Sequence, residues 1–141
     1  MENWTEAERL IKESAEVFQK ADLQQDNMKF VWGSLAEIYI TKGMPDKAVE
    51  QIDLILEDRE TSEINPLCIG LEIRLFYICC RVLLACNDQR AQKVIETAYS
   101  LVQEYAAKIE SEELRKSFLN NVPWNKKIID LWEAEQGEKE N

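Results

Sequence analysis

The sequence predicts an all-α fold, and three features of the chain support this prediction. Apolar residues recur at three- and four-residue spacing along most of the 141 residues, as they do on one face of an amphipathic helix. Only four glycines and three prolines are present, which leaves few places for the tight turns of a sheet-rich fold. Short polar breaks separate the periodic stretches, so consecutive helices are expected to pack as antiparallel neighbours.

The first helix is expected over residues 5–20, where apolar residues have helical spacing. Thr5 and Glu8 have the spacing of a capping box, in which each side chain bonds to a backbone N–H of the other residue. A polar break over residues 22–27 ends this helix.

Two further helices, residues 27–42 and about 45–58, are expected to form a hairpin. Gly43 suits the left-handed residue that closes a helix. Pro45 suits the first turn of the next helix, where a backbone N–H would lack a helical partner in any case. The link between the two helices is therefore predicted to be tight.

The fourth helix is expected at about residues 66–86, after a break at residues 61–65, and Asn65–Pro66 is a strong helix start. This helix is apolar almost all round, which predicts a position in the middle of the structure. Asn87–Asp88 then turns the chain. The fifth helix carries apolar residues at helical spacing, namely Val94, Ile95, Ala98, Leu101, Val102, Tyr105 and Ile109.

The C-terminal part is expected to contain two more helices and a tail. Ser111 is the predicted cap of a short sixth helix, and a seventh helix begins after Val122–Pro123. The apolar stripe of the seventh helix consists of Trp124, Ile128, Leu131 and Trp132. From Glu135 the sequence is charged, and residues 135–141 are expected to form a frayed tail.

Seventeen basic and twenty-seven acidic residues give the chain a net charge of −10. DNA, RNA and anionic membrane surfaces would be repelled by this charge, whereas a basic protein partner is allowed. The most apolar run, residues 75–86, is interrupted by Arg81 and is too short to span a bilayer. No leader-like pattern opens the sequence, so we expect a cytoplasmic protein that binds neither nucleic acid nor membrane.

Four cysteines and the complete absence of histidine restrict the chemistry of the chain. Cys68, Cys79, Cys80 and Cys86 fall in one predicted helix, where their axial spacing excludes an internal disulfide or a shared zinc ion. We expect them to be small buried residues. The lack of histidine removes the commonest general base and the usual nucleophile pairs. We therefore expect no metal, no cofactor and no catalysis; a small enzyme that uses carboxylates is the catalytic alternative.

Two stretches of the chain share one pattern of large and small residues. The first consists of Trp32, Leu35, Ala36 and Tyr39, followed by Ala48 and Ile52. The second begins 43 residues later and consists of Leu75, Ile78, Cys79 and Val82, followed by Ala91, Ile95 and Ala98. Both resemble the tetratricopeptide repeat, whose signature places Trp, Leu, Gly and Tyr on one helix and Ala and Phe on the next. The resemblance implies a right-handed superhelix of antiparallel helix pairs with a C-terminal capping helix.

A third match, Ala7, Ile11 and Ser14, corresponds to the second helix of such a repeat, and its own first helix is missing. The resemblance thus implies one domain over residues 1–134, with an orphan helix (4–21), two repeats (27–60 and 65–109) and capping helices (111–134). The pattern departs from the family in three ways. The copies are 41 and 43 residues apart, where the family has about 34; Ala and Cys replace the signature Gly; and the closing Pro is absent.

Long repeats of this kind, and the segment 106–132, are similar to parts of bacterial multidomain signalling and regulatory proteins. The resemblance implies a scaffold that binds a peptide or helix of a protein partner. The alternative is a regulatory or sensor segment of a larger bacterial signalling protein that controls an attached effector. Self-association is also possible, because the orphan helix leaves an apolar face in need of cover.

The first helix of each repeat would line a concave binding face in this family. On that frame the face consists of Phe30, Gly33, Ser34, Glu37 and Thr41, then Ile73, Phe76, Tyr77, Cys80 and Leu84. The expected partner contacts are Phe30, Ser34, Glu37, Thr41, Tyr77 and Cys80. The Lys and Asn with which some family members grip a carboxylate are absent, so an amphipathic helix or apolar peptide fits better. As an alternative, Ile73, Phe76 and Leu84 are simply covered by a neighbouring helix.

Trp124 and Trp132 lie eight residues apart on one face of the last predicted helix. One interpretation is that they seal the end of the solenoid, whose last hydrophobic face needs a cover. The other is that they are exposed aromatic anchors for a partner, since Trp is enriched at binding hot spots.

Overall fold

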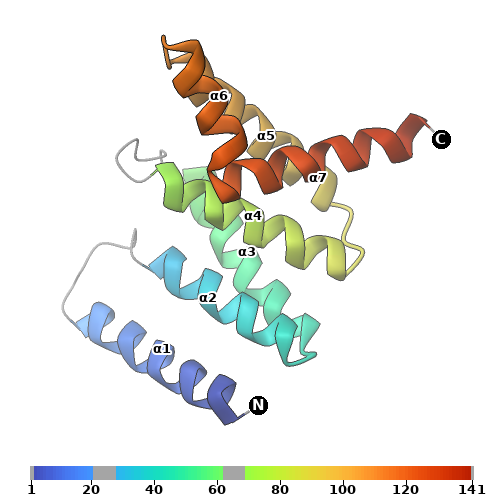
Figure 1. Cartoon of the computed structure of the whole chain (residues 1–141). Helices are drawn as coiled ribbons and strands as arrows, with labels where there is room; N and C mark the ends of the chain where they lie inside the picture. Colours follow the sequence, from blue (N-terminus) through green and yellow to red (C-terminus); the bar gives the residue numbers. More distant parts are fainter. Residues whose placement is uncertain (1, 21–27, 62–68, 141) are drawn as a thin grey trace. The chain divides into compact units, whose positions relative to one another are not determined.

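The computed structural model describes residues 2–20, 28–61 and 69–140, and within them all regular secondary structure is helical (Figure 1). The helices are α1 (Glu2–Lys20), α2 (Met28–Thr41), α3 (Pro45–Thr61), α4 (Ile69–Ala85), α5 (Ala91–Ala107), α6 (Glu112–Asn121) and α7 (Pro123–Glu140). The all-α prediction is confirmed. Internal contacts divide the chain into two compact units, residues 1–64 and 65–141, and each unit is described by itself. A single domain over residues 1–134 stays a prediction.

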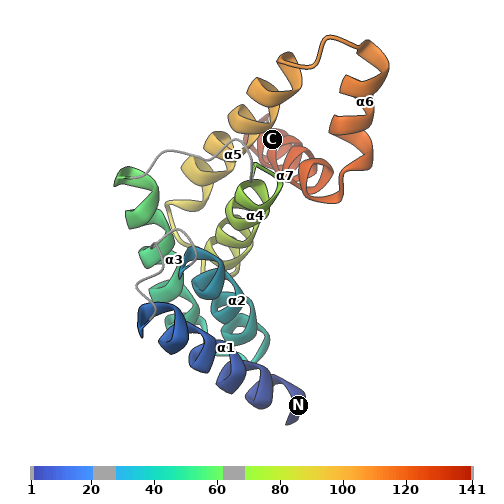
Figure 2. The ribbon, with the colours of Figure 1, turned by 90° about the vertical axis from the view of Figure 1, so that its left-hand side faces the viewer.

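In the first unit, α2 packs against both α1 and α3, which places it in the centre (Figures 1 and 2). The link between α2 and α3 closes where the sequence predicts. Gly43 adopts a φ of +75°, and the N–H of Met44 donates to the carbonyl of Tyr39 at 2.8 Å. The N–H of Gly43 donates to the carbonyl of Ile40 at 3.2 Å, which completes a Schellman motif. Pro45 then opens α3, so the predicted tight hairpin is confirmed.

The α2–α3 hairpin is held by small residues that let the helices approach and by isoleucines that fill the space between them. Ala36 and Ala48 are completely buried, one on each helix. Ile52 and Ile55 of α3 are also buried, at 0% and 1% exposure. Removing one isoleucine side chain from water stabilises the unit by about 2 kcal/mol.

A polar contact joins α1 to α2. Glu8 accepts a hydrogen bond from the hydroxyl of Tyr39 at 3.1 Å, and its other carboxylate oxygen lies 2.9 Å from Nζ of Lys42. Lys12 reaches the same carboxylate from one turn further along α1, at 2.9 Å. Because α1 begins at Glu2, Thr5 lies inside the helix, and the predicted capping box of Thr5 and Glu8 is wrong. The carboxylate of Glu8 serves tertiary packing instead.

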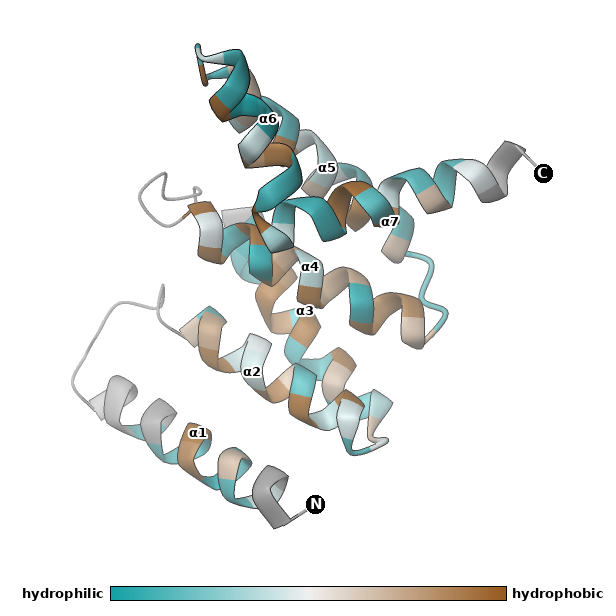
Figure 3. Ribbon diagram, in the orientation of Figure 1, coloured by the Kyte–Doolittle hydropathy of each residue, from teal (hydrophilic) through white to brown (hydrophobic). Residues whose placement is uncertain are grey.

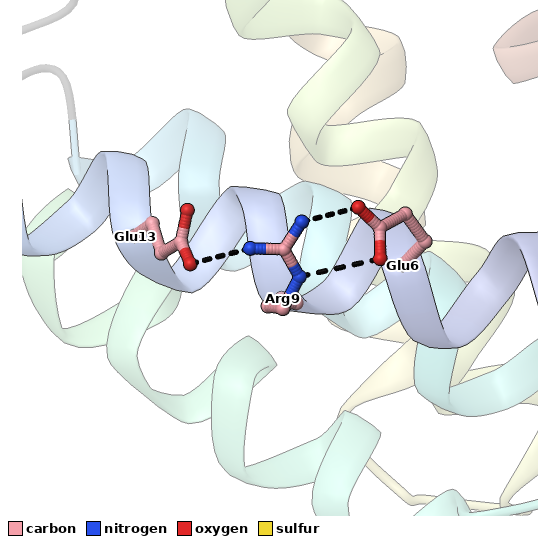
Figure 4. Close-up of polar contacts among 3 residues, drawn as sticks. All are labelled: Glu6, Arg9 and Glu13. Carbon is pink, nitrogen blue, oxygen red and sulfur yellow. Dashed lines mark hydrogen bonds and ion pairs between the residues drawn. The ribbon is translucent and has the colours of Figure 1, made fainter.

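The outer side of α1 carries a different set of charges. Arg9 donates to the carboxylates of Glu6 and Glu13, which lie three and four residues away (Figure 4). All three side chains are more than half exposed. Water and salt screen such pairs, so this network contributes little to stability beyond local helix formation.

The second unit begins with the hairpin α4–α5, and α7 packs against both of its helices. Its link repeats the closure of the first hairpin with a different residue. Asn87 adopts a φ of +52°, and the N–H of Asp88 donates to the carbonyl of Leu83 at 2.9 Å. Asparagine tolerates this conformation better than most residues. The carboxylate of Asp88 accepts the backbone N–H of Arg90 at 2.9 Å and also pairs with its guanidinium.

A sharp corner joins α6 to α7. Ser111 caps α6 as predicted, because its hydroxyl accepts the N–H of Leu114 at 3.3 Å. Pro123 is the first residue of α7. The buried side chain of Asn125 donates to the carbonyl of Phe118 at 2.9 Å and so satisfies a carbonyl near the end of α6. Residues of α6 are mostly hydrophilic and none of them is buried (Figure 3).

The end of α7 differs from the prediction of a frayed tail, and the predicted breaks between helices are largely untested. The helix continues to Glu140, so the charged stretch from Glu135 is helical rather than frayed. Glutamate, glutamine and lysine are good helix formers, and charge alone does not end a helix. The predicted breaks at residues 22–27 and 61–65, and the predicted start at Asn65–Pro66, lie outside the described residues apart from Thr61, which is the last residue of α3.

Candidate functional site: an aromatic and cationic cluster on α4 and α7

Four of the residues predicted to contact a partner form one line along α2. Phe30, Ser34, Glu37 and Thr41 follow each other at three- and four-residue spacing, and we call them the α2 stripe. Thr41 is exposed and the other three are half-buried. The hydroxyl of Thr41 donates to the carbonyl of Glu37 at 2.8 Å, and Nζ of Lys29 lies 5.5 Å from the ring centroid of Phe30.

The corresponding residues of α4 are mostly in the interior. Ile73, Phe76 and Cys80 are buried and Leu84 is half-buried. The alternative in which a neighbouring helix covers these residues therefore holds for Ile73 and Phe76 but not for Leu84. Burial also raises the pKa of the Cys80 thiol to about 12, because the thiolate would lose its hydration. Cys80 is therefore not presented to a partner, whereas Tyr77 remains half-buried.

Tyr77 belongs to a compact group of four side chains, which we call the cation–aromatic cluster. Its ring centroid lies 5.6 Å from that of Trp124, with the planes tilted by 45°. Nζ of Lys127 lies 4.8 Å from the Trp124 ring centroid and 5.4 Å from that of Tyr77. The guanidinium carbon of Arg74 lies 5.3 Å from the Trp124 ring centroid. Both cations are within the range in which an aromatic face attracts positive charge.

Helix geometry explains why these four residues meet. Arg74 and Tyr77 are three residues apart on α4, and Trp124 and Lys127 are three residues apart on α7. Residues at this spacing share a helix face, and α4 packs against α7. Each helix therefore contributes one aromatic ring and one cation.

The second predicted anchor, Trp132, is engaged in packing. Its indole ring stacks on Tyr99 of α5, with centroids 4.0 Å apart and an interplanar angle of 7°. Trp124 contacts α4 and Trp132 contacts α5, so the two tryptophans attach α7 to both helices of the hairpin. This geometry favours the interpretation that they seal the hairpin, although both rings stay partly exposed.

Neighbouring charges in α7 are arranged differently from Lys127. Lys126 forms an ion pair with Asp130 at 3.0 Å, and this contact raises the pKa of the Lys126 ammonium group. The ammonium group of Lys127 lies over two aromatic rings instead. The two adjacent lysines therefore offer a matched pair for experiments on this surface.

Sequence reasoning selected Tyr77, Trp124 and Trp132 but missed Arg74 and Lys127. The signal that could have found them is the pairing of a cation with an aromatic residue at three-residue spacing, which occurs on both helices. Local spacing cannot show that the two pairs face each other, because that depends on the packing of α7 against α4.

No protein-family model, curated protein or solved structure matches the chain. Within the helices described above, none is long and apolar enough to cross a membrane. Among the side chains that the structure describes, no three Cys, Asp or Glu residues gather into a set that could hold a metal ion.

Proposed function

We propose that the chain is a non-catalytic scaffold of tetratricopeptide-like repeats that holds a peptide or helix of a protein partner. The observation that carries the proposal is the shared internal register of the two hairpins. Positions 43 residues apart are buried in both, namely Ala36 with Cys79, Ala48 with Ala91, and Ile52 with Ile95. A left-handed residue closes each hairpin after its first helix, Gly43 in one and Asn87 in the other.

This shared register supports a repeat because small residues and isoleucine stand at equivalent positions where the two helices of each hairpin pack together. Small residues on both helices permit close approach, and an isoleucine one turn after the second small residue fills the gap. Stacked pairs of this type form extended surfaces that bind other proteins. In the right-handed superhelix that we propose, the α2 stripe would belong to the concave face.

The composition agrees with binding rather than catalysis. The chain contains no histidine, and the shifted pKa values of Glu8 and Asp88 arise from ion pairs and hydrogen bonds with neighbouring Lys, Tyr and Arg groups. Cys79 and Cys80 are buried as thiols, which fits the cytoplasmic location that we propose.

The proposal is tested by isolating the complex of the full chain with a protein from its source cells. We expect one partner at fixed stoichiometry, and Ser34→Arg should weaken its binding because a long charged side chain then occupies the middle of the α2 stripe. Ser100→Arg adds the same side chain at an exposed position of α5 and serves as the matched control. Binding that both variants leave intact would remove the α2 stripe from the interface, and a chain that captures no partner would contradict the scaffold itself.

A further inference from the structure

The cation–aromatic cluster has the composition of a binding surface. Tyr77, Trp124 and Arg74 are half-buried, and Lys127 is exposed. Tyr, Trp and Arg are the residue types that dominate the energetics of protein interfaces. Here they are held in place by their contacts with each other, so little side-chain freedom is left to lose when a ligand binds.

We propose that the cluster of Arg74, Tyr77, Trp124 and Lys127 is a docking site for an acidic segment of a partner protein that carries a large apolar side chain beside a carboxylate. This inference rests on the proposed function in one respect, namely that the ligand is a protein segment. It adds a second surface to the α2 stripe and specifies the chemistry of its occupant.

The chemistry follows from what each group can still offer. An ammonium group carries three N–H donors, and the faces of Tyr77 and Trp124 engage its charge without accepting all of them. A carboxylate that approaches Lys127 from the solvent side would accept the remaining donors in a charge-assisted hydrogen bond. The exposed parts of the two rings beside it would cover an apolar side chain of the same segment.

The local charge differs from the charge of the whole chain. Residues 1–64 contain fifteen acidic and seven basic residues, whereas residues 65–141 contain twelve and ten. Charges separated by more than about 8 Å are largely screened at physiological ionic strength. Acidic residues far from the cluster are therefore screened, and the net charge of −10 does not exclude an acidic ligand.

A nucleic acid fits this surface less well than an acidic peptide. Sequence-independent binding to a phosphate backbone draws its affinity from many cationic contacts, so a surface with only a few cations gains little affinity in this way. The cluster supplies two cations on a unit whose acidic residues outnumber its basic ones. A peptide segment with one carboxylate beside one apolar side chain needs no more than the two cations and two rings of the cluster.

The test uses the full chain and two synthetic peptides of equal length that share a central Trp-Leu pair. One peptide flanks this pair with Asp and Glu and the other with Lys. Titration calorimetry should detect binding of the acidic peptide and not of the basic one. Lys127→Glu should lower the affinity for the acidic peptide by about tenfold or more, because it places a carboxylate where the cation was. Lys126→Glu changes the net charge equally, but Lys126 pairs with Asp130 and lies over neither ring, so the affinity should stay within about threefold.

Several results would overturn the inference. Equal weakening by the two lysine variants would show a general charge effect, and equal binding of both peptides would show simple apolar adhesion. Tighter binding of a single-stranded RNA oligonucleotide would assign the cluster to nucleic acid. Light scattering that shows a dimer lost only in Lys127→Glu would assign it to a second copy of the chain.

Two controls separate this inference from the proposed function and from misfolding. The thermal unfolding of each variant is compared with that of the native chain, because Lys126→Glu breaks the ion pair with Asp130 whereas Lys127→Glu removes the contacts with two rings. A loss of binding counts only in a variant that stays folded at the temperature of the titration. If the natural partner binds through the α2 stripe while neither peptide binds, only the cluster inference fails. If the acidic peptide binds and no natural partner is found, the cluster inference stands without the scaffold proposal.

Discussion

The indole ring of Trp132 lies almost parallel to the phenol ring of Tyr99, with the two centroids 4.0 Å apart. This stack joins the middle of α7 to α5, while Trp124 joins the start of α7 to α4. Helix α7 is thus attached at two points to the hairpin beneath it. Each of the two tryptophans, which the sequence predicts to be either seals or anchors, thus has a defined packing contact. Mutation can measure how much each contact contributes to stability.

We expect Trp132→Ala to destabilise the chain by about 2 kcal/mol, because it removes a large, partly buried ring and its stacking contact with Tyr99. Urea unfolding followed by far-UV circular dichroism measures the change. Trp132→Phe should recover a large part of the loss, since phenylalanine keeps a ring against Tyr99. Unchanged stability in the alanine variant, together with weakened partner binding, would instead identify Trp132 as an anchor.

The contact of Glu8 with Tyr39 and Lys42 predicts a local effect on α1. Glu8 is only 14% exposed, and hydrogen bonds to a charged group contribute about 2 kcal/mol when they are protected from water. Glu8→Gln should therefore increase opening of α1, seen as faster amide hydrogen exchange in this helix but not in α5. Glu13→Gln is the matched control on the same helix, because Glu13 contacts only the exposed Arg9 among its described ion pairs. Equal exchange in both variants would contradict the role of Glu8.

The same contact predicts the pH dependence of stability. Hydrogen bonds from Lys42, Lys12 and Tyr39 lower the pKa of Glu8 from 4.5 to about 2. Because the unfolded chain binds this proton more readily, the stabilisation is fully present above about pH 5 and is lost as the pH falls toward 2. The free energy of unfolding of the native chain should decline across this range more steeply than that of Glu8→Gln. Asp88, whose pKa Arg90 lowers to about 2, contributes in the same direction to both proteins. Parallel curves would contradict the assignment.

Replacement by alanine is expected to have opposite effects on stability at Gly43 and at Gly137, because only Gly43, which closes α2, has a left-handed backbone conformation. Gly43→Ala should cost about 1 kcal/mol, because a φ of +75° is strained for any residue with a Cβ atom. Gly137 lies in α7 with an ordinary φ, and no atom of a neighbouring residue would come within 4 Å of an added Cβ atom. Gly137→Ala should therefore stabilise the helix by about 0.5 kcal/mol. Chemical denaturation of the two variants measures both signs. A stabilising Gly43→Ala would show that this turn is not closed as described.

These results show which features local sequence determines. The turn at Gly43 and the cap at Ser111 were predictable, because each depends on backbone conformation within a few residues. The capping box at Glu8 was mispredicted for the complementary reason. Its real partners, Tyr39 and Lys42, lie 31 and 34 residues away, and no local pattern reports them.

In the candidate site, too, some features follow from local sequence and others depend on tertiary packing. The pairing of a ring with a cation on each helix is visible in the sequence, but the meeting of Lys127 with Tyr77 depends on how α7 packs against α4. The burial of Cys80 is likewise a tertiary property. Its helix is apolar on nearly every side, so the spacing alone could not tell an open face from a covered one.

Thiol reactivity tests which side of α4 is covered. Cys80 is completely buried and the pKa of its thiol is raised to about 12, so the thiol stays protonated at pH 8. Cys86, which the sequence predicts to be buried inside the fourth helix, lies just beyond the end of α4 and is only half-buried, and Cys68 lies outside the described residues. In the folded chain, alkylation by iodoacetamide should therefore modify Cys86 well before Cys80, as peptide mapping by mass spectrometry can measure. In urea the two should react at similar rates. Equal rates in the folded chain would place Cys80 on an accessible face, as the tetratricopeptide frame expects, and would reopen α4 as part of the binding surface.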